Sequence, residues 1–146
     1  MGRLKAVPNG GRRLNKVVAR FRDGRMVKGS TSDFVPSKEQ FHVAPMDAPR
    51  GTKPTLVQVK DLKAIFFVKD FVGRPDYTPT NEFGDDRTAA GSRKIKVVFA
   101  DGEVIVGTTQ GYQPGRPGFF MIPADQAVNI ERCYVVAAAT TEITLL

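Results

Sequence analysis

The chain has 146 residues, of which 41% are hydrophobic and 25% charged, with one cysteine, one histidine and no tryptophan. This length allows one ordinary hydrophobic core or two small ones, and it excludes a large multidomain enzyme. The lone Cys133 excludes an internal disulfide, and one histidine leaves little for a transition-metal site. No apolar stretch is long enough to span a membrane, so we expect a cytoplasmic protein with no membrane contact, no metal and no cofactor.

The net charge of +7 is concentrated at one end of the chain. Residues 1–28 contain nine Lys or Arg and one acidic residue, a sum of +8, so the other 118 residues sum to 7 − 8 = −1. Such a cluster forms either a surface that binds a polyanion or a segment that only keeps the protein soluble.

The sequence contains an internal repeat. Shifting the chain by 78 residues aligns 16–68 with 94–146 without a gap, and 12 of the 53 aligned positions (68 − 16 + 1) are identical. A fixed period of this kind predicts two copies of one folded unit. Residues 1–15 are expected to form a basic disordered arm, and 69–93, rich in Pro, Gly, Asp and Thr, a polar linker.

In chain order, the first expected strand covers residues 16–22, where Val17, Ala19 and Phe21 alternate with residues of the solvent face. Asp23-Gly24 then predicts a hairpin, and Asp101-Gly102 repeats it in the second copy. A two-residue turn would bury Lys28, so we predict a type I turn with a glycine bulge, which leaves Lys28 outside. Gly29 and its counterpart Gly107 are expected to bend the second strand.

Three further strands are predicted in each copy. In the first they cover 41–45, 56–60 and 62–68, with a sharp turn at Asp61. In the second, 119–123 forms the third strand and the last strand ends at Leu146. Five short, strongly bent strands in each copy predict an all-β protein of two tandem five-stranded small barrels, Sm-like or SH3-like, over 16–68 and 94–146.

The segment Val17–Gly29, with its Asp-Gly turn and glycine-bent second strand, resembles the first motif of the Sm-like superfamily. Residues 57–65 are similar to its second motif, and also to the small C-terminal barrel of a ribosome-maturation factor. The resemblance implies a small barrel, RNA contact at the Lys60 turn, and rings built through the last strand. Ala138 replaces Lys60 in the second copy, so the implied RNA contact belongs to the first copy. The paired arrangement, including residues 111–120, also resembles an uncharacterised bacterial family of paired Asp-Gly barrels.

Nothing in the sequence indicates catalysis. It has no phosphate-binding loop, no serine nucleophile elbow, no paired cysteines and no zinc-binding helix motif. Cys133 and His42 lie in different copies, so we expect a packed thiol and a surface imidazole. We therefore predict that the protein is not an enzyme and has no small-molecule substrate.

The basic cluster is the predicted nucleic-acid-binding site, with RNA favoured over DNA. Strand alternation places Lys16, Arg20 and Arg22 on one solvent face, and Lys28 is near them on the next strand. Cations gathered in this way hold phosphate groups with little dependence on base sequence. Phe34 and Tyr112 could stack on bases, although their matching positions favour a role in the core. The candidate residues are Arg12, Arg13, Lys16, Arg20, Arg22, Arg25, Lys28 and Lys60.

The competing prediction is a protein-interaction scaffold or a self-assembling regulatory module. Neighbouring strand residues face opposite sides, so only one member of Phe66-Phe67 and one of Phe119-Phe120 enters its barrel. The other is expected to pack against the partner barrel, or otherwise to join chains into a homo-oligomer.

Overall fold

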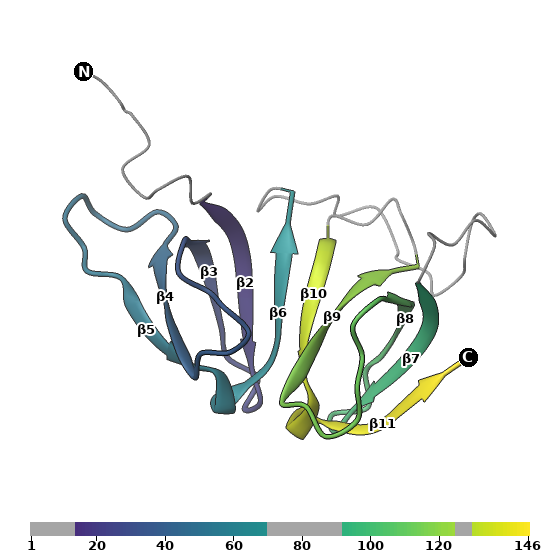
Figure 1. Cartoon of the computed structure of the whole chain (residues 1–146). Coiled ribbons are helices and arrows are strands. Elements are labelled where there is room, and N and C mark those ends of the chain that lie inside the picture. The colour runs from purple at the N-terminus through teal and green to yellow at the C-terminus, as the bar shows by residue number, and fades with distance from the viewer. Residues whose placement is uncertain (1–13, 70–91, 125–129) are drawn as a thin grey trace, which may run out of the picture.

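The computed structural model describes residues 14–69, 92–124 and 130–146, and Figure 1 shows its arrangement. All ten strands of these residues belong to one antiparallel sheet of order β11-β7-β8-β9-β10-β6-β2-β3-β4-β5. The all-β prediction is confirmed. The expectation of two separate closed barrels is not, because the sheet is continuous and open, with β5 and β11 as its two edges.

The two copies of the repeat form two similar halves of this sheet (Figure 1). The first half contains β2 (Asn15–Phe21), β3 (Met26–Thr31), β4 (Gln40–Pro45), β5 (Thr55–Gln58), the 3-10 helix η1 (Val59–Asp61) and β6 (Leu62–Val68). The second contains β7 (Arg93–Phe99), β8 (Val104–Thr109), β9 (Gly118–Pro123), β10 (Ile130–Val136), η2 (Ala137–Ala139) and β11 (Thr140–Leu145).

The predicted bulged hairpin is confirmed. The Phe21 amide donates to the Arg25 carbonyl at 2.8 Å and the Gly24 amide donates to the Phe21 carbonyl at 3.1 Å, so the loop holds three residues. Gly24 has φ +97°, a left-handed conformation that favours glycine. The second half repeats this turn around Gly102, with φ +94°. As expected, Lys28 is exposed.

Gly29 and Gly107 lie where β3 and β8 each cross closely over the next strand. A Cβ atom on Gly29 would lie 2.1 Å from the Ala44 carbonyl oxygen, and one on Gly107 would lie 2.0 Å from that of Ile122. Both positions therefore require glycine, because no side chain has room there. That these glycines also bend the strands stays a prediction.

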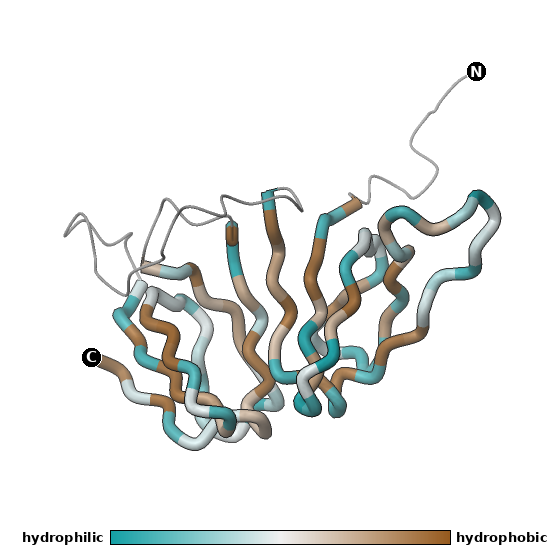
Figure 2. The backbone as a smooth tube through the Cα atoms, turned by 180° about the vertical axis from the view of Figure 1, so that it is seen from behind, coloured by the Kyte–Doolittle hydropathy of each residue, from teal (hydrophilic) through white to brown (hydrophobic). Residues whose placement is uncertain are grey.

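Strands β6 and β10 join the two halves by pairing along their length, with Phe66 opposite Cys133 and Ile65 opposite Tyr134. All seven residues of β6 are buried. Figure 2 shows apolar residues along these central strands and hydrophilic residues in the turns below them. A strand that is buried on both faces has no alternating pattern, as the run Ala64–Val68 shows.

Each half completes its hydrophobic core with side chains from the other. Ala64, Phe66 and Val68 project from β6 into the core of the second half, beside Ile95, Phe99 and Met121. Tyr134 and Val136 project from β10 into the core of the first half, beside Phe41 and Leu62. The predicted tandem of two barrels is not confirmed, because each half buries part of its apolar surface against side chains of the other.

Some predicted boundaries also change. The strand expected over 56–60 ends at Gln58, and the turn expected at Asp61 is the 3-10 helix η1. Arg93, the last residue of the expected linker 69–93, is instead the first residue of β7. Residues 70–91 of the expected linker lie outside the described part of the chain. Most of the expected arm 1–15 also lies outside it, and Asn15 already belongs to β2.

Candidate nucleic-acid interface

Three of the predicted cations lie on the outer face of β2 and β3. The strand register places Lys16 opposite Ser30, Val18 opposite Lys28 and Arg20 opposite Met26, so Lys28 is the diagonal neighbour of both Lys16 and Arg20. Diagonal neighbours on one face lie within reach of long side chains. We call the surface formed by Lys16, Arg20 and Lys28 the basic face. Lys16 and Lys28 are exposed, and neither forms an ion pair with another described residue.

Arg20 lies at the border between the halves and is half-buried. Its Nη1 atom lies 3.5 Å from a carboxylate oxygen of Glu103 in the turn between β7 and β8, and its guanidinium lies 5.7 Å from the Phe66 ring centre. This pairing reduces the charge that Arg20 offers to a ligand. That Arg20 contributes to phosphate binding stays a prediction.

Beside Arg20, Lys63 forms a buried ionic contact that the sequence did not predict. Its side chain is 5% exposed, and Nζ donates to Asp101 at 2.7 Å and to Glu103. The hydrogen bond from Lys63 is the main reason that the pKa of Asp101 lies below its usual value. We call this group, Lys63 with Asp101, Glu103 and Arg20, the polar clasp. It fastens β6 of the first half to the β7–β8 turn of the second.

The first hairpin and η1, which carry the next group of candidate cations, lie at the bottom of the molecule in the view of Figure 1. Arg25 Nε lies 2.8 Å from the Asp23 carboxylate, and hydrogen bonds from Arg25, first that of its backbone amide and then that of its side chain, lower the pKa of Asp23. Arg22 is exposed, and its amide donates to the Asp61 carbonyl at 3.0 Å. Lys60 is also exposed, and like Arg22 it forms no ion pair with a described residue. The fold thus gathers some of the candidates, and Arg25 is partly neutralised.

Arg12 and Arg13, the two remaining basic candidates, lie outside the described residues. Of the candidate aromatic residues, Phe34 packs among Phe41, Phe67, Phe120 and Tyr134, with ring centres 5.1 to 6.2 Å away. Tyr112 packs on Phe119 at 4.9 Å. Both contribute to the cores, as their matching positions favoured.

The four phenylalanines of the predicted interface divide between the two cores. Phe66 and Phe119 belong to the core of the second half, whereas Phe67 belongs to that of the first, with the half-buried Phe120 packed against it. Phe67 is 2% exposed and faces the first core, so it is not available as an exposed interface residue.

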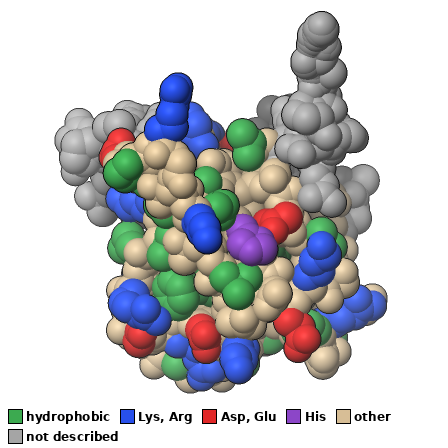
Figure 3. Space-filling model, turned by 90° about the vertical axis from the view of Figure 1, so that its left-hand side faces the viewer, with side chains coloured by type: hydrophobic (Ala, Val, Ile, Leu, Met, Phe, Trp, Pro, Cys, Tyr) green, Lys and Arg blue, Asp and Glu red, His purple; other side chains and the backbone are tan. Residues whose placement is uncertain are grey.

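Cys133 and His42 do not form a catalytic pair. Cys133 is fully buried, which raises the pKa of its thiol far above the usual value. His42 is exposed and its Nδ1 lies 2.8 Å from Asp33, beside the carboxylate in Figure 3. Burial opposes ionisation of Asp33, but hydrogen bonds from His42 outweigh it and lower the pKa. The described residues contain no group of three or more metal-ligating side chains.

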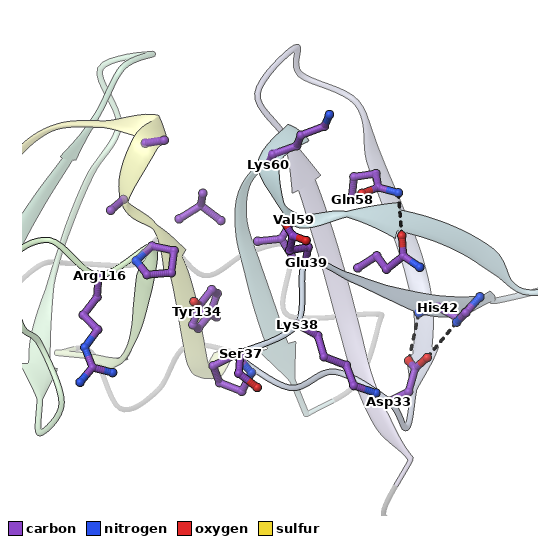
Figure 4. A pocket seen from close by; sticks show the side chains of 16 residues that line it. Asp33, Ser37, Lys38, Glu39, His42, Gln58, Val59, Lys60, Arg116 and Tyr134 are labelled. Atoms are coloured by element: carbon purple, nitrogen blue, oxygen red, sulfur yellow. Dashed lines mark hydrogen bonds and ion pairs between the residues drawn. The ribbon is translucent and has the colours of Figure 1, made fainter.

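A groove of about 1050 Å³ opens between the two halves (Figure 4). The loop between β3 and β4, the end of β5 and η1 line one side, and β10, η2 and the loop before β9 line the other. Lys38 and Lys60 of the first half and Arg116 of the second are among its lining residues. Sequence reasoning missed Lys38 and Arg116, although they are counterparts in the repeat (38 + 78 = 116) and carry the same charge.

The protein is all-β, with one open sheet whose two halves each contribute side chains to the core of the other. A family model described as "Family of unknown function (DUF6982)" matches residues 12–146, so the chain belongs to this family. No curated protein and no solved structure matches the chain. No helix of the described residues is long and apolar enough to cross a membrane.

Proposed function

We propose that this protein is a non-enzymatic nucleic-acid-binding module, with RNA as the favoured ligand and the basic face as its contact surface. The observation that carries the proposal is the strand register, which makes Lys16 and Lys28 diagonal neighbours and leaves both exposed and unpaired among the described residues. Two lysines held side by side on a rigid sheet are suited to adjacent phosphates.

The distribution of charge over the chain supports this assignment. Residues 1–28 sum to +8, while the remainder is nearly neutral, so the charge that attracts a polyanion is concentrated in the N-terminal part of the sequence, which includes β2. Figure 3 shows one side of the molecule, on which cationic and acidic side chains are interspersed.

The test is binding to a short RNA across a salt series, with the purified protein freed of nucleic acid. Lys16→Gln with Lys28→Gln should weaken binding and reduce the slope of log affinity against log salt by about 1.4 for a single strand, since each lost phosphate contact contributes about 0.7. The matched control is Arg50→Gln with Lys53→Gln, which removes two exposed charges from the loop between β4 and β5. If both pairs changed affinity equally, the basic face would have no special role.

The scaffold alternative loses one of its supports in this fold. Phe66, Phe67 and Phe119 are buried within the molecule, so they offer no surface to a partner protein. What remains for this alternative is the pair of free edges, β5 and β11.

A further inference from the structure

We infer that the groove between the halves binds a single strand of RNA and gives the protein a preference for single strands over duplexes. This inference rests on the proposed function and adds a second, distinct contact surface to it. None of the residues that carry it, Lys38, Arg116, Arg132, Pro36 and Pro117, belongs to the basic face.

The groove continues from the first half onto the second. A further hollow of about 540 Å³ shares Pro36, Arg116 and Tyr134 with it and extends over the outer surface of β8 and β9 to Arg132. Together the two hollows form one trough across the seam, which we call the seam groove. Its course from η1 to β9 suits an extended chain better than a compact small molecule.

Four cations line the seam groove, together with three carboxylates: the cations are Lys38, Lys60, Arg116 and Arg132, and the carboxylates are Asp33, Glu39 and Glu131. Lys38, Lys60 and Arg116 are exposed, form no ion pair with another described residue, and lie on opposite sides of the groove in Figure 4. Of the carboxylates in the first hollow, Asp33 is already engaged by His42. Cations on both walls can hold a phosphate backbone between them.

The groove also provides surfaces for unpaired bases. Pro36 and Pro117 are exposed on its walls, and Ile122 is 48% exposed in the second hollow. The Arg132 guanidinium lies 4.3 Å from the Phe67 ring centre and 5.0 Å from that of Phe120, and Arg132 is exposed. A guanidinium held against aromatic rings is a stacking platform for a base.

These features favour a single strand, because a duplex keeps its bases stacked inside and has no unpaired base to place on proline or arginine. A flat surface such as the basic face makes no such distinction. The seam groove should therefore contribute to single-strand affinity and contribute nothing to duplex affinity.

The experiment compares a 12-nucleotide single-stranded RNA with a duplex RNA of the same length, each titrated in a salt series. Lys38→Gln with Arg116→Gln should reduce the single-strand salt slope by about 1.4 and leave duplex affinity unchanged. Arg132→Lys retains the charge and removes the planar surface, so it should lower single-strand affinity about fivefold or more with the slope unchanged. Arg50→Gln with Lys53→Gln is the matched control, and thermal melts verify that each variant is folded.

Other outcomes are distinguishable. If the groove variants bound both RNAs like the wild type while Lys16→Gln with Lys28→Gln lost binding, the inference would be wrong and the proposed function would stand. Failure of the wild type to bind either RNA would overturn both. Binding of an oligoglutamate peptide that the groove variants abolish, without an effect on RNA, would assign the groove to an acidic protein segment and overturn the inference.

Discussion

At the scale of single residues, two glycines, Gly29 and Gly107, allow neighbouring strands to cross closely. Alanine at Gly29 would place its Cβ atom 2.1 Å from the Ala44 carbonyl oxygen, a backbone atom that cannot turn aside. We expect Gly29→Ala to lower the free energy of unfolding by about 2–3 kcal/mol, as overpacked substitutions do. Urea denaturation measures this.

The control for that measurement is Gly111→Ala, because a Cβ atom at Gly111 meets nothing within 4 Å. Its effect should stay below about 0.5 kcal/mol. Equal destabilisation at both positions would show that backbone freedom, rather than the close crossing of β3 and β4, is what glycine provides.

Lys63 is the residue whose charge links the halves, and its contribution should depend on pH. Asp101 has a pKa below 3.8 in the folded protein, mainly because Lys63 donates a hydrogen bond to it. A lowered pKa stabilises the fold above the unfolded value of 3.8, and this stabilisation is lost as the pH falls through the folded value. Thermal stability should therefore fall below about pH 4.

Lys63→Met tests this assignment. The variant removes a buried charge, while Asp101 and Glu103 are exposed enough to be hydrated, so stability at pH 7 should change by less than about 1 kcal/mol or increase. Its loss of stability between about pH 5 and pH 2.5 should be smaller than that of the wild type. Thermal melts at the two pH values check both statements, and an unchanged acid response would mean that Asp101 does not depend on Lys63.

At the scale of elements, β6 belongs to both cores. Phe66 belongs to the first copy of the repeat, yet its side chain lies in the core of the second half and is only 5% exposed. We expect Phe66→Ala to destabilise the protein by about 3–5 kcal/mol, which is the usual cost of removing a buried phenyl ring. Denaturation should remain a single transition, because β6 contributes side chains to both cores and weaker packing of β6 destabilises both halves together.

The matched control is Ile122→Ala on β9, since Ile122 is 48% exposed and should contribute less than about 1 kcal/mol. Two separate transitions in Phe66→Ala, with only the second half destabilised, would contradict the idea of one cooperative unit.

The elements were largely predictable from the sequence, and their association was not. Alternation at Val17 and Ala19, the Asp-Gly turns and the bend at Gly29 are local signals, so strands and hairpins could be derived from neighbouring residues. The pairing of β6 with β10 joins residues that are far apart in the chain, and nothing local specifies it. The run Ala64–Val68 predicted burial but did not indicate which residue enters which core.

The candidate site was predictable only where its residues lie on one strand pair. Lys16 and Lys28 follow from alternation and the bulged turn. The partner of Arg20, Glu103, and the groove around Lys38 and Arg116 depend on how the two halves meet. The repeat offset was the one available signal for the groove, because it shows a cation at the same position of both copies.

At the scale of the whole molecule, the repeat indicates where the sheet stops. In the internal junction, Ala64 and Phe66 of β6 enter the other core. Their counterparts 78 residues later, on the free edge β11, are Glu142 and Thr144. Joining β11 to β5 of a second chain in the same way would bury the Glu142 carboxylate with the Thr144 hydroxyl as its hydrogen-bond donor and no cation to balance its charge, which is costly.

We therefore expect a monomer of 16.0 kDa in solution. Sedimentation equilibrium up to high protein concentration checks this. A concentration-dependent rise to a defined oligomer would contradict it and would return attention to the edges as assembly surfaces.

The seven buried residues of β6 also affect how the correct strand register is selected. A strand that is polar on one face resists sliding by one residue, because the slip would expose its apolar face. Strand β6 is largely apolar on both faces, so a one-residue shift in its register would only exchange Phe66 and Phe67 between the two hydrophobic cores. Lys63 is the charged exception within it, and only the observed alignment brings its ammonium group to Asp101. The contact between Lys63 and Asp101, which joins the two halves, therefore also favours the observed register of β6 over a shifted one.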